Sequence, residues 1–141
     1  MKIVICEIEP WERAAFEGLQ KDHDVIFENA KLSAETASKH ADADIISTFI
    51  YSDLDRDILK AFLNLKLIAT RSTGFDHIHL ETCAEQDIRV ANVPTYGENT
   101  VAEHVFALLL AIAHNLIEAV DRTRRGNFSM AGLRGFDLQG K

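Results

Sequence analysis

The feature that most constrains this chain is a regular alternation of strand-like and helix-like patterns that starts at the second residue. Short apolar, β-branched runs predict strands at 2–6, 23–27, 44–48, 65–70 and 88–91. Helical spacing of apolar residues predicts helices at 9–20, 33–40, 53–62 and 78–86, the second with Ser33 as its N-cap. Strands joined through helices by short connections are typical of a parallel, doubly wound α/β sheet. We predict a five-stranded, flavodoxin-like sheet with the strand order 2-1-3-4-5.

A further helix, predicted at 99–125, is different in kind. Between Val101 and Val120 apolar residues occupy every face of this helix, and such a helix is usually buried on more than one side. One small sheet can cover only one side, so a second domain or a second copy of the chain is expected to cover the rest. We therefore expect a flavodoxin-like domain at 1–98, followed at 99–141 by an interdomain or dimerisation helix and a glycine-rich linker or docking segment.

Composition and charge exclude several classes of partner. A net charge of −7 argues against nucleic acid and anionic membranes as partners, because both call for a basic face. The longest apolar run, Val105 to Ala113, is too short to span a bilayer, and no secretory signal pattern is visible at the start. Cys6 and Cys83 are too few for a disulfide framework and lie in apolar segments. These features predict a soluble, cytoplasmic protein with reduced core thiols.

Ligands of open α/β sheets bind at the carboxyl ends of the strands. Three such ends stand out here, at 49–52, 71–74 and 92–97. Gly74 would let the backbone approach a ligand closely and leave N–H groups available for a carboxylate. Tyr51 and Tyr96 would wall the same pocket. Turns at strand ends use these residue types as well, so the spacing alone leaves both interpretations open.

Other candidate sites are weaker. His77, His79 and Cys83 suggest a metal site, but on a helix the two histidines would point roughly 200° apart, and no further ligands complete a shell. His104, beside Glu103, fits a structural hydrogen bond better than catalysis. No G-x-G-x-x-G occurs, so the sequence lacks the usual pyrophosphate site for a dinucleotide.

Three strings in this chain resemble a known enzyme family. They are LKLIATRSTGFDHI at 65–78, NVPTYGENTVAEHVFALLL at 92–110 and DLQGK at 137–141. In this order they resemble the NAD-dependent D-isomer-specific 2-hydroxyacid dehydrogenases, above all the D-lactate dehydrogenase-like members. The resemblance implies that the first part of the chain is a substrate-binding domain. It also implies that the helix after VAEH crosses toward a cofactor domain and helps to build a dimer.

The resemblance also implies roles for single residues. The backbone at Thr73 and Gly74 would hold the substrate carboxylate, and Tyr96 would be an aromatic wall over the substrate. Thr73 and Thr100 would lie on the nicotinamide side of the cofactor. The family's catalytic arginine, glutamate and histidine, and its glycine loop, belong to segments beyond position 141. The family usually has an acidic residue where His79 stands, so weaker capping of the helix at 78–86 is expected.

The sequence therefore predicts the substrate-binding domain of an NAD-dependent D-2-hydroxyacid dehydrogenase that reduces a 2-oxo acid such as pyruvate. On its own the chain is expected to be inactive, to bind NAD at best weakly, and to form a homodimer through 101–120. The alternative is a free-standing flavodoxin-like binding or oligomerisation module without catalysis. A receiver domain is disfavoured because Thr48 and Phe49 stand where its phosphate-accepting Asp is needed, and a flavodoxin because 7–10 lacks a phosphate loop.

Overall fold

The structure is a computed structural model that describes residues 1–140. Lys141, the last residue of the DLQGK string, lies outside the described residues. The chain divides into two compact units, with the boundary between Tyr96 and Gly97.

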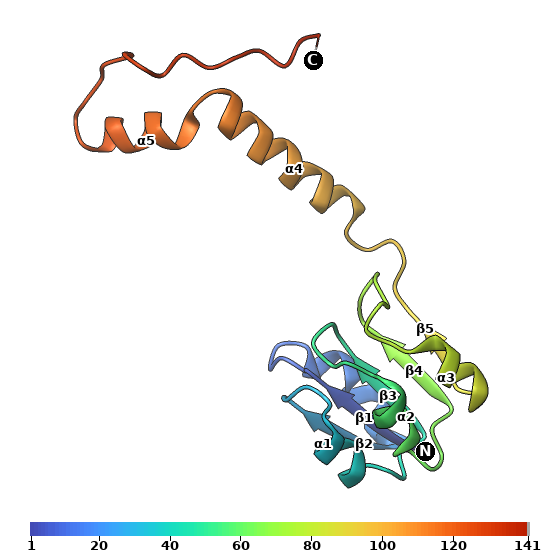
Figure 1. Ribbon diagram of the computed structural model, residues 1–141. Coiled ribbons are helices and arrows are strands. Elements are labelled where there is room, and N and C mark those ends of the chain that lie inside the picture. Colours follow the sequence, from blue (N-terminus) through green and yellow to red (C-terminus); the bar gives the residue numbers. More distant parts are fainter. Residues whose placement is uncertain (141) are drawn as a thin grey trace. The chain divides into compact units, whose positions relative to one another are not determined.

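The first unit is built on one parallel sheet (Figure 1). Its strands are β1 (Lys2–Cys6), β2 (Asp24–Glu28), β3 (Ile45–Thr48), β4 (Leu67–Thr70) and β5 (Arg89–Ala91). They lie in the order β2-β1-β3-β4-β5, which confirms the predicted α/β class and strand order. In the centre of the sheet Val4 pairs with Ile26 on one side and with Ile46 on the other.

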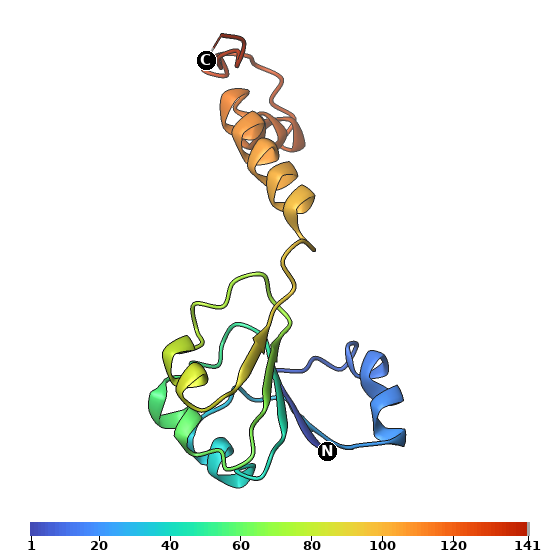
Figure 2. The same cartoon turned by 90° about the vertical axis from the view of Figure 1, so that its right-hand side faces the viewer.

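Helices cover both faces of this sheet (Figure 2). The helices α1 (Ala34–Lys39), α2 (Arg56–Lys60) and α3 (Leu80–Glu85) pack on one face, and the 3-10 helix η1 (Arg13–Lys21) lies on the other. Coverage on two sides explains why the run at β1 is continuously apolar. Val4 and Cys6 belong to the larger core, whereas Ile3 and Ile5 belong to the smaller one.

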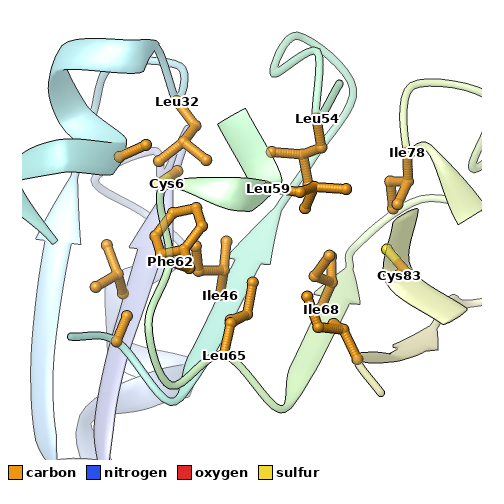
Figure 3. Packing of buried hydrophobic residues seen from close by; sticks show 14 residues of the cluster. Cys6, Leu32, Ile46, Leu54, Leu59, Phe62, Leu65, Ile68, Ile78 and Cys83 are labelled. Carbon is orange, nitrogen blue, oxygen red and sulfur yellow. The ribbon is translucent and has the colours of Figure 1, made fainter. Parts of the chain in front are cut away.

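The larger core lies between the sheet and α1, α2 and α3 (Figure 3). Cys6 and Cys83 are free, buried thiols in this core, as predicted. Burial, together with the nearby Glu7 carboxylate, raises the pKa of the Cys6 thiol to about 12. A thiol that stays protonated is a poor nucleophile, so Cys6 acts as a small apolar core residue.

The prediction for the first helix was partly wrong. The chain turns at Glu9–Glu12, where the Glu12 N–H donates to the Glu9 carbonyl (3.0 Å), and the helix that follows is 3-10 rather than α. Trp11, which lies within the predicted helix at 9–20, is in that turn and is 80% exposed. Among residues 1–140, the core on this face is a small cluster of three buried residues, Ile3, Ile5 and Ile8, against which Phe16 of η1 packs.

The sequence led to expectations for the N-caps of two short helices, α1 and α3, and the structure shows both caps. Ser33 Oγ accepts a hydrogen bond from the Thr36 N–H (3.3 Å), which confirms the predicted N-cap of α1. At α3, where weaker capping was expected, His79 still supplies a side-chain cap. His79 Nδ1 accepts from the Thr82 N–H (3.2 Å) and contacts the Thr82 hydroxyl (3.0 Å), so an imidazole takes the part of the expected carboxylate.

The second unit contains two helices, α4 (Glu98–Ala113) and α5 (Leu116–Arg124), so the prediction of one helix over 99–125 was wrong. The break falls at Asn115, which adopts the left-handed conformation (φ 48°) that asparagine tolerates better than most residues. The two helix axes differ by 66°. No single helix in residues 1–140 is long and apolar enough to cross a membrane; only the bent pair of α4 and α5 meets the length and composition requirements together.

The segment after α5 forms no helix or strand within residues 126–140 and folds back on the α4–α5 break. The Phe136 N–H donates to the Ala113 carbonyl (2.9 Å), and Asn115 Nδ2 donates to the Leu133 carbonyl (3.3 Å). Gly135 lies so close to the end of α4 that an added Cβ would stand 1.9 Å from the Ala113 oxygen. A glycine is therefore required at this approach.

Candidate functional site

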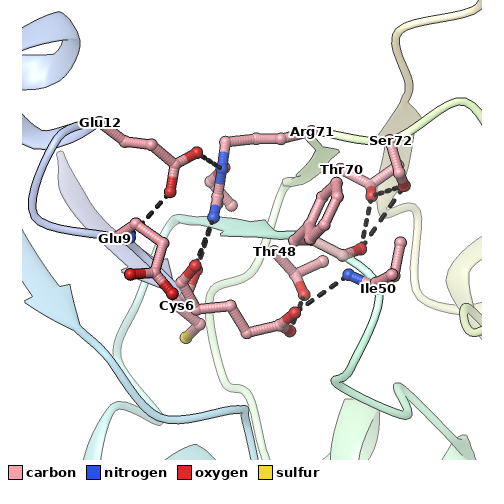
Figure 4. A network of polar contacts seen from close by, with 11 residues as sticks. Cys6, Glu9, Glu12, Thr48, Ile50, Thr70, Arg71 and Ser72 are labelled. Atoms are coloured by element: carbon pink, nitrogen blue, oxygen red, sulfur yellow. Dashed lines mark hydrogen bonds and ion pairs between the residues drawn. The ribbon is translucent and has the colours of Figure 1, made fainter. Parts of the chain in front are cut away.

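The sequence placed a binding site in the loops after β3, β4 and β5. In the structure a connected set of polar side chains joins the carboxyl ends of β1, β3 and β4 (Figure 4). We call this set the Glu7–Arg71 network; its members are Glu7, Glu12, Thr48, Ser52 and Arg71.

Glu7, directly after β1, is the acceptor at the centre of this network. One carboxylate oxygen, Oε2, accepts the N–H groups of Ile50 (3.0 Å) and Tyr51 (2.8 Å). The other, Oε1, accepts the Thr48 hydroxyl (2.7 Å), the Ser52 N–H (2.9 Å) and the Ser52 hydroxyl. Burial alone would raise the pKa of Glu7, but these hydrogen bonds outweigh it and hold the pKa below its ordinary value. Glu7 is therefore a buried carboxylate that stays ionised.

Arg71, directly after β4, is the matching donor. Its Nη2 donates to the carbonyl oxygens of Cys6 and Glu7 (3.0 Å each), and its Nη1 donates to the Ser47 hydroxyl (3.1 Å). Its Nε forms an ion pair with Glu12 (3.4 Å). The guanidinium is thus engaged on three sides by the protein itself and braces the backbone after β1.

The loop at 71–74 is held by its own hydroxyl groups. The Ser72 hydroxyl donates to the Gly74 carbonyl (2.7 Å) and lies 2.6 Å from the Thr70 hydroxyl. The Thr70 hydroxyl in turn donates to the Phe49 carbonyl (3.0 Å). Within residues 1–140, the N–H groups of Thr73 and Gly74 donate to no protein acceptor. The loop is therefore fixed while two of its backbone donors remain available.

Side chains and backbone also join the loops after β4 and β5. The Thr73 hydroxyl donates to the Val93 carbonyl (3.0 Å), and Asn92 Nδ2 donates to the Thr73 carbonyl (2.8 Å). The Val93 N–H donates to the Ser72 carbonyl (3.0 Å). The structure thus brings Thr73 against the 92–93 segment that leads toward Tyr96.

The other candidate residues lie as follows. Gly74 has open space beside its backbone, since an added Cβ would meet only Asp76 Oδ2, at 3.6 Å. Tyr51 and Tyr96 are 66% and 62% exposed, and the Tyr51 ring packs edge-on against Phe49. Thr100 lies in the first turn of α4, in the second unit.

The residues considered for a metal serve other purposes. His79 caps α3, Cys83 is buried in the core, and His77 Nε2 lies 3.5 Å from the Thr70 hydroxyl. In the part of the chain that the structure describes, no group of three His, Cys, Asp or Glu side chains is placed to hold a metal ion. A cavity of about 320 Å³ beside His77 and His79 is lined by none of the candidate binding residues.

Sequence reasoning did not identify Glu7 and Arg71 as a functional pair. The signal that was present is a charged residue placed directly after a buried strand, at 2–6 and again at 65–70. A charge at that position faces the rim of the sheet, and the two charges lie on strands that share β3 as a neighbour. Only the sheet order shows that they come together.

Comparison with known proteins gives one consistent family. The sequence profile of the family described as "D-isomer specific 2-hydroxyacid dehydrogenase, catalytic domain" matches residues 3–130. A 2-hydroxyacid dehydrogenase homolog of Zymomonas mobilis is 34% identical over 84% of this chain and 37% of its own length. A second homolog, from Schizosaccharomyces pombe, is 32% identical over 100% of this chain and 44% of its own length.

Solved structures agree with the sequence relatives. The D-lactate dehydrogenase of Aquifex aeolicus, complexed with NAD and lactic acid, superposes with a TM-score of 0.85 at 31% identity, over 96% of this chain and 41% of that one. A structure that identifies the pyruvate reductase of Chlamydomonas reinhardtii gives a TM-score of 0.73 at 34% identity, over 97% of this chain and 42% of that one. The chain spans less than half the length of the relatives it matches.

Proposed function

This chain belongs to the D-isomer specific 2-hydroxyacid dehydrogenase family, and from that premise we propose that its first unit is the substrate-binding part of an NAD-dependent D-2-hydroxyacid dehydrogenase. The reaction proposed for the complete enzyme is hydride transfer between NAD and C2 of a 2-oxo acid such as pyruvate. The relatives named D-lactate dehydrogenase, and the neighbour that holds NAD and lactic acid, support this choice of substrate and cofactor.

The observation that carries the proposal is the loop at 71–74. We assign the available N–H groups of Thr73 and Gly74 to the substrate carboxylate. Because Ser72 and Thr70 already fix this loop, its donors would bind without reorganisation, which favours tight and specific recognition. The Arg71 side chain, although close in sequence, is engaged by the protein and is not assigned to the substrate.

Tyr51 and Tyr96 are proposed as walls of the substrate site, since both follow the carboxyl ends of strands and both are exposed. Thr73 and Thr100 are proposed to lie toward the nicotinamide. The Thr73 hydroxyl already donates to the Val93 carbonyl, so its oxygen is left to accept a hydrogen bond, which suits an amide N–H. Residues 1–140 supply no glycine loop for the pyrophosphate, so they fit only the substrate-facing edge of a cofactor site.

We propose that this chain alone neither catalyses the reaction nor binds NAD tightly. It is proposed to act instead as the part that binds and orients the substrate. The unit at 99–141 is proposed as an interdomain and dimerisation segment, supported by the exposed apolar side chains of α4. The two free cysteines fit a reducing compartment such as the cytoplasm. A free-standing oligomerisation module is the second candidate, and the same apolar side chains favour it.

The substitution Gly74→Val tests the assignment in the complete enzyme. Because an added Cβ at Gly74 would meet only Asp76 Oδ2, at 3.6 Å, we expect Val to leave the fold largely intact while it covers the N–H groups meant for the carboxylate. We expect kcat/KM for pyruvate to fall by roughly a hundredfold or more, equivalent to the loss of one or two charge-assisted hydrogen bonds.

The matched control is Gly18→Ala, at a glycine on η1 with nothing near its added Cβ. It should leave kcat/KM within about twofold. Full activity of the Gly74→Val enzyme with an unchanged melting temperature would contradict the assignment. NADH-linked pyruvate reduction by the 141-residue chain itself would contradict the proposal that other segments supply the chemistry.

A further inference from the structure

We propose that Glu7 is a positioning residue that holds Tyr51 over the substrate by binding the backbone of the segment 49–52, which we call the Tyr51 loop. The proposal rests on the proposed function only in taking Tyr51 to contact the substrate. It adds that Glu7 fixes the position of Tyr51, and that the Glu7–Arg71 network connects the Tyr51 loop to the 71–74 loop.

The first step is the geometry of the Tyr51 loop. Three successive N–H groups, of Ile50, Tyr51 and Ser52, converge on one carboxylate. Successive N–H groups that point into one concavity form an anion-binding site, and here the anion is a side chain of the same unit. The N–H groups of Ile50, Tyr51 and Ser52 are therefore all bound by Glu7, whereas those of Thr73 and Gly74 remain available. The Tyr51 loop presents a side chain to a ligand rather than backbone donors.

The second step is that the two oxygens of Glu7 hold different parts of the loop. Oε1 binds Thr48 and Ser52, and Ser52 is anchored again because its hydroxyl accepts the Leu32 N–H (2.8 Å). Oε2 alone binds the N–H groups of Ile50 and Tyr51. Loss of Oε2 would release the tip of the loop, while Thr48 lies in the paired strand β3 and Ser52 keeps its second anchor. Glu7 therefore stabilises the fold and, in addition, holds the tip of the Tyr51 loop in place.

The third step is the coupling to Arg71. Glu7 has a left-handed backbone (φ 56°), a conformation that needs support in a residue other than glycine. Arg71 Nη2 supplies it by bridging the carbonyl oxygens of Cys6 and Glu7. Arg71 also begins the 71–74 loop. Through these hydrogen bonds the Glu7–Arg71 network connects the backbone of the Tyr51 loop with the residue that begins the 71–74 loop; Figure 4 shows Arg71 and Ile50 within this network.

The direct test is amide hydrogen exchange in this chain, with Glu7→Gln and, as a matched control, Glu9→Gln, two positions away at an exposed site. A glutamine has one acceptor oxygen, so it cannot satisfy both sets of donors. In Glu7→Gln, we expect the exchange rates of the Ile50 and Tyr51 amides to increase by a factor at least roughly ten times larger than that of the Ile46 amide. Ile46 lies in β3, so its exchange reports opening of the fold. Glu9→Gln should change neither.

Equal acceleration at Tyr51 and Ile46 would overturn the proposal, because Glu7 would then stabilise the whole unit without positioning the loop. Unchanged exchange at Tyr51 would overturn it as well. Neither outcome depends on catalysis. Failure of this inference is therefore distinguishable from failure of the proposed function, which the Gly74→Val enzyme tests separately.

A double-mutant cycle in the complete enzyme tests the consequence for substrate. Glu7→Gln should raise KM for pyruvate severalfold while KM for NADH stays within about twofold. In a Tyr51→Ala background the same Glu7→Gln change should add nothing further, because the side chain that it positions is absent. An undiminished rise of KM in that background would show that Glu7 acts by another route and would overturn the positioning role.

Discussion

At the scale of single residues, the rim of this sheet contains two sets of backbone N–H donors, of which one has a protein acceptor and the other has none within residues 1–140. The N–H groups of Ile50, Tyr51 and Ser52 are filled by Glu7, whereas those of Thr73 and Gly74 have no acceptor within residues 1–140. Only the second set can take an external carboxylate. The Glu7 carboxylate thus fills the backbone donors of one rim loop, while those of the neighbouring loop stay available.

The ionisation of Glu7 predicts a particular dependence of stability on pH. Its pKa is lowered in the folded chain, so its contribution to stability is complete above the ordinary value of 4.5 and is lost as the pH falls from there through the folded pKa. We expect Glu7→Gln to reduce the free energy of unfolding by roughly 2–3 kcal/mol at pH 7, since hydrogen bonds to a charged group are lost. At pH 3 the difference from wild type should be smaller, because the unfolded chain is then protonated at Glu7 and folding in the ionised form costs the release of that proton.

Urea unfolding of both proteins at the two pH values measures this difference. The pKa values of Glu28, Asp42 and Asp44 are also lowered, but these carboxylates are present in both proteins and their effects cancel in the comparison. A difference that stays constant between pH 7 and pH 3 would mean that the ionised carboxylate contributes nothing beyond its size and shape.

At the scale of elements, apolar runs predicted the strands because parallel strands are buried on both faces, and the strand order followed from the choice of a flavodoxin-like fold. It placed the helix ends less well. α2 begins only at Arg56, where Asp55 caps it by accepting the N–H groups of Asp57 (3.0 Å) and Ile58 (2.8 Å). The break escaped prediction because apolar residues flank His114 and Asn115 on both sides, and only the left-handed conformation of Asn115 marks it.

The Glu7–Arg71 network could not be predicted for a related reason. Glu7 meets its partners 41 to 45 residues along the chain, and Arg71 meets the Glu7 carbonyl 64 residues away. Contacts of that separation leave no trace in local spacing. By contrast, Thr73 and Gly74 could be picked out because a glycine after a buried strand is a local signal, although the availability of their N–H groups needed the structure.

The return of the tail to the α4–α5 break gives a prediction for the second unit. With Gly135→Ala, the new Cβ would overlap the Ala113 carbonyl oxygen, so the tail must move away and lose the hydrogen bond from Phe136 to Ala113. Amide exchange at Phe136 should accelerate by roughly tenfold, the equivalent of one lost hydrogen bond. Gly97→Ala, where nothing lies near the added Cβ, is the control. Unchanged exchange in Gly135→Ala would show that the tail does not dock at the break.

At the scale of the whole molecule, the second unit carries many exposed apolar side chains on α4. Val105, Phe106 and Ile112 are 55%, 59% and 68% exposed, and Leu109 is 37% exposed. An apolar surface of this kind is rare in monomers and usually marks an interface. Burying each side chain in a partner would contribute on the order of 1.5–3 kcal/mol before the entropy of association is subtracted.

We therefore expect the chain to associate with itself through α4 at micromolar concentration, as a symmetric dimer or by exchange of the helix. Light scattering coupled to size exclusion measures the mass directly. Phe106→Glu with Ile112→Glu should return the chain to a 15.8 kDa monomer, because two buried charges would lack partners at the interface. Phe128→Glu, at a 79% exposed position outside α4, should leave the dimer intact. A wild-type chain that elutes as a monomer would contradict self-association. A dimer that survives both charges on α4 would show that the chains associate through another surface.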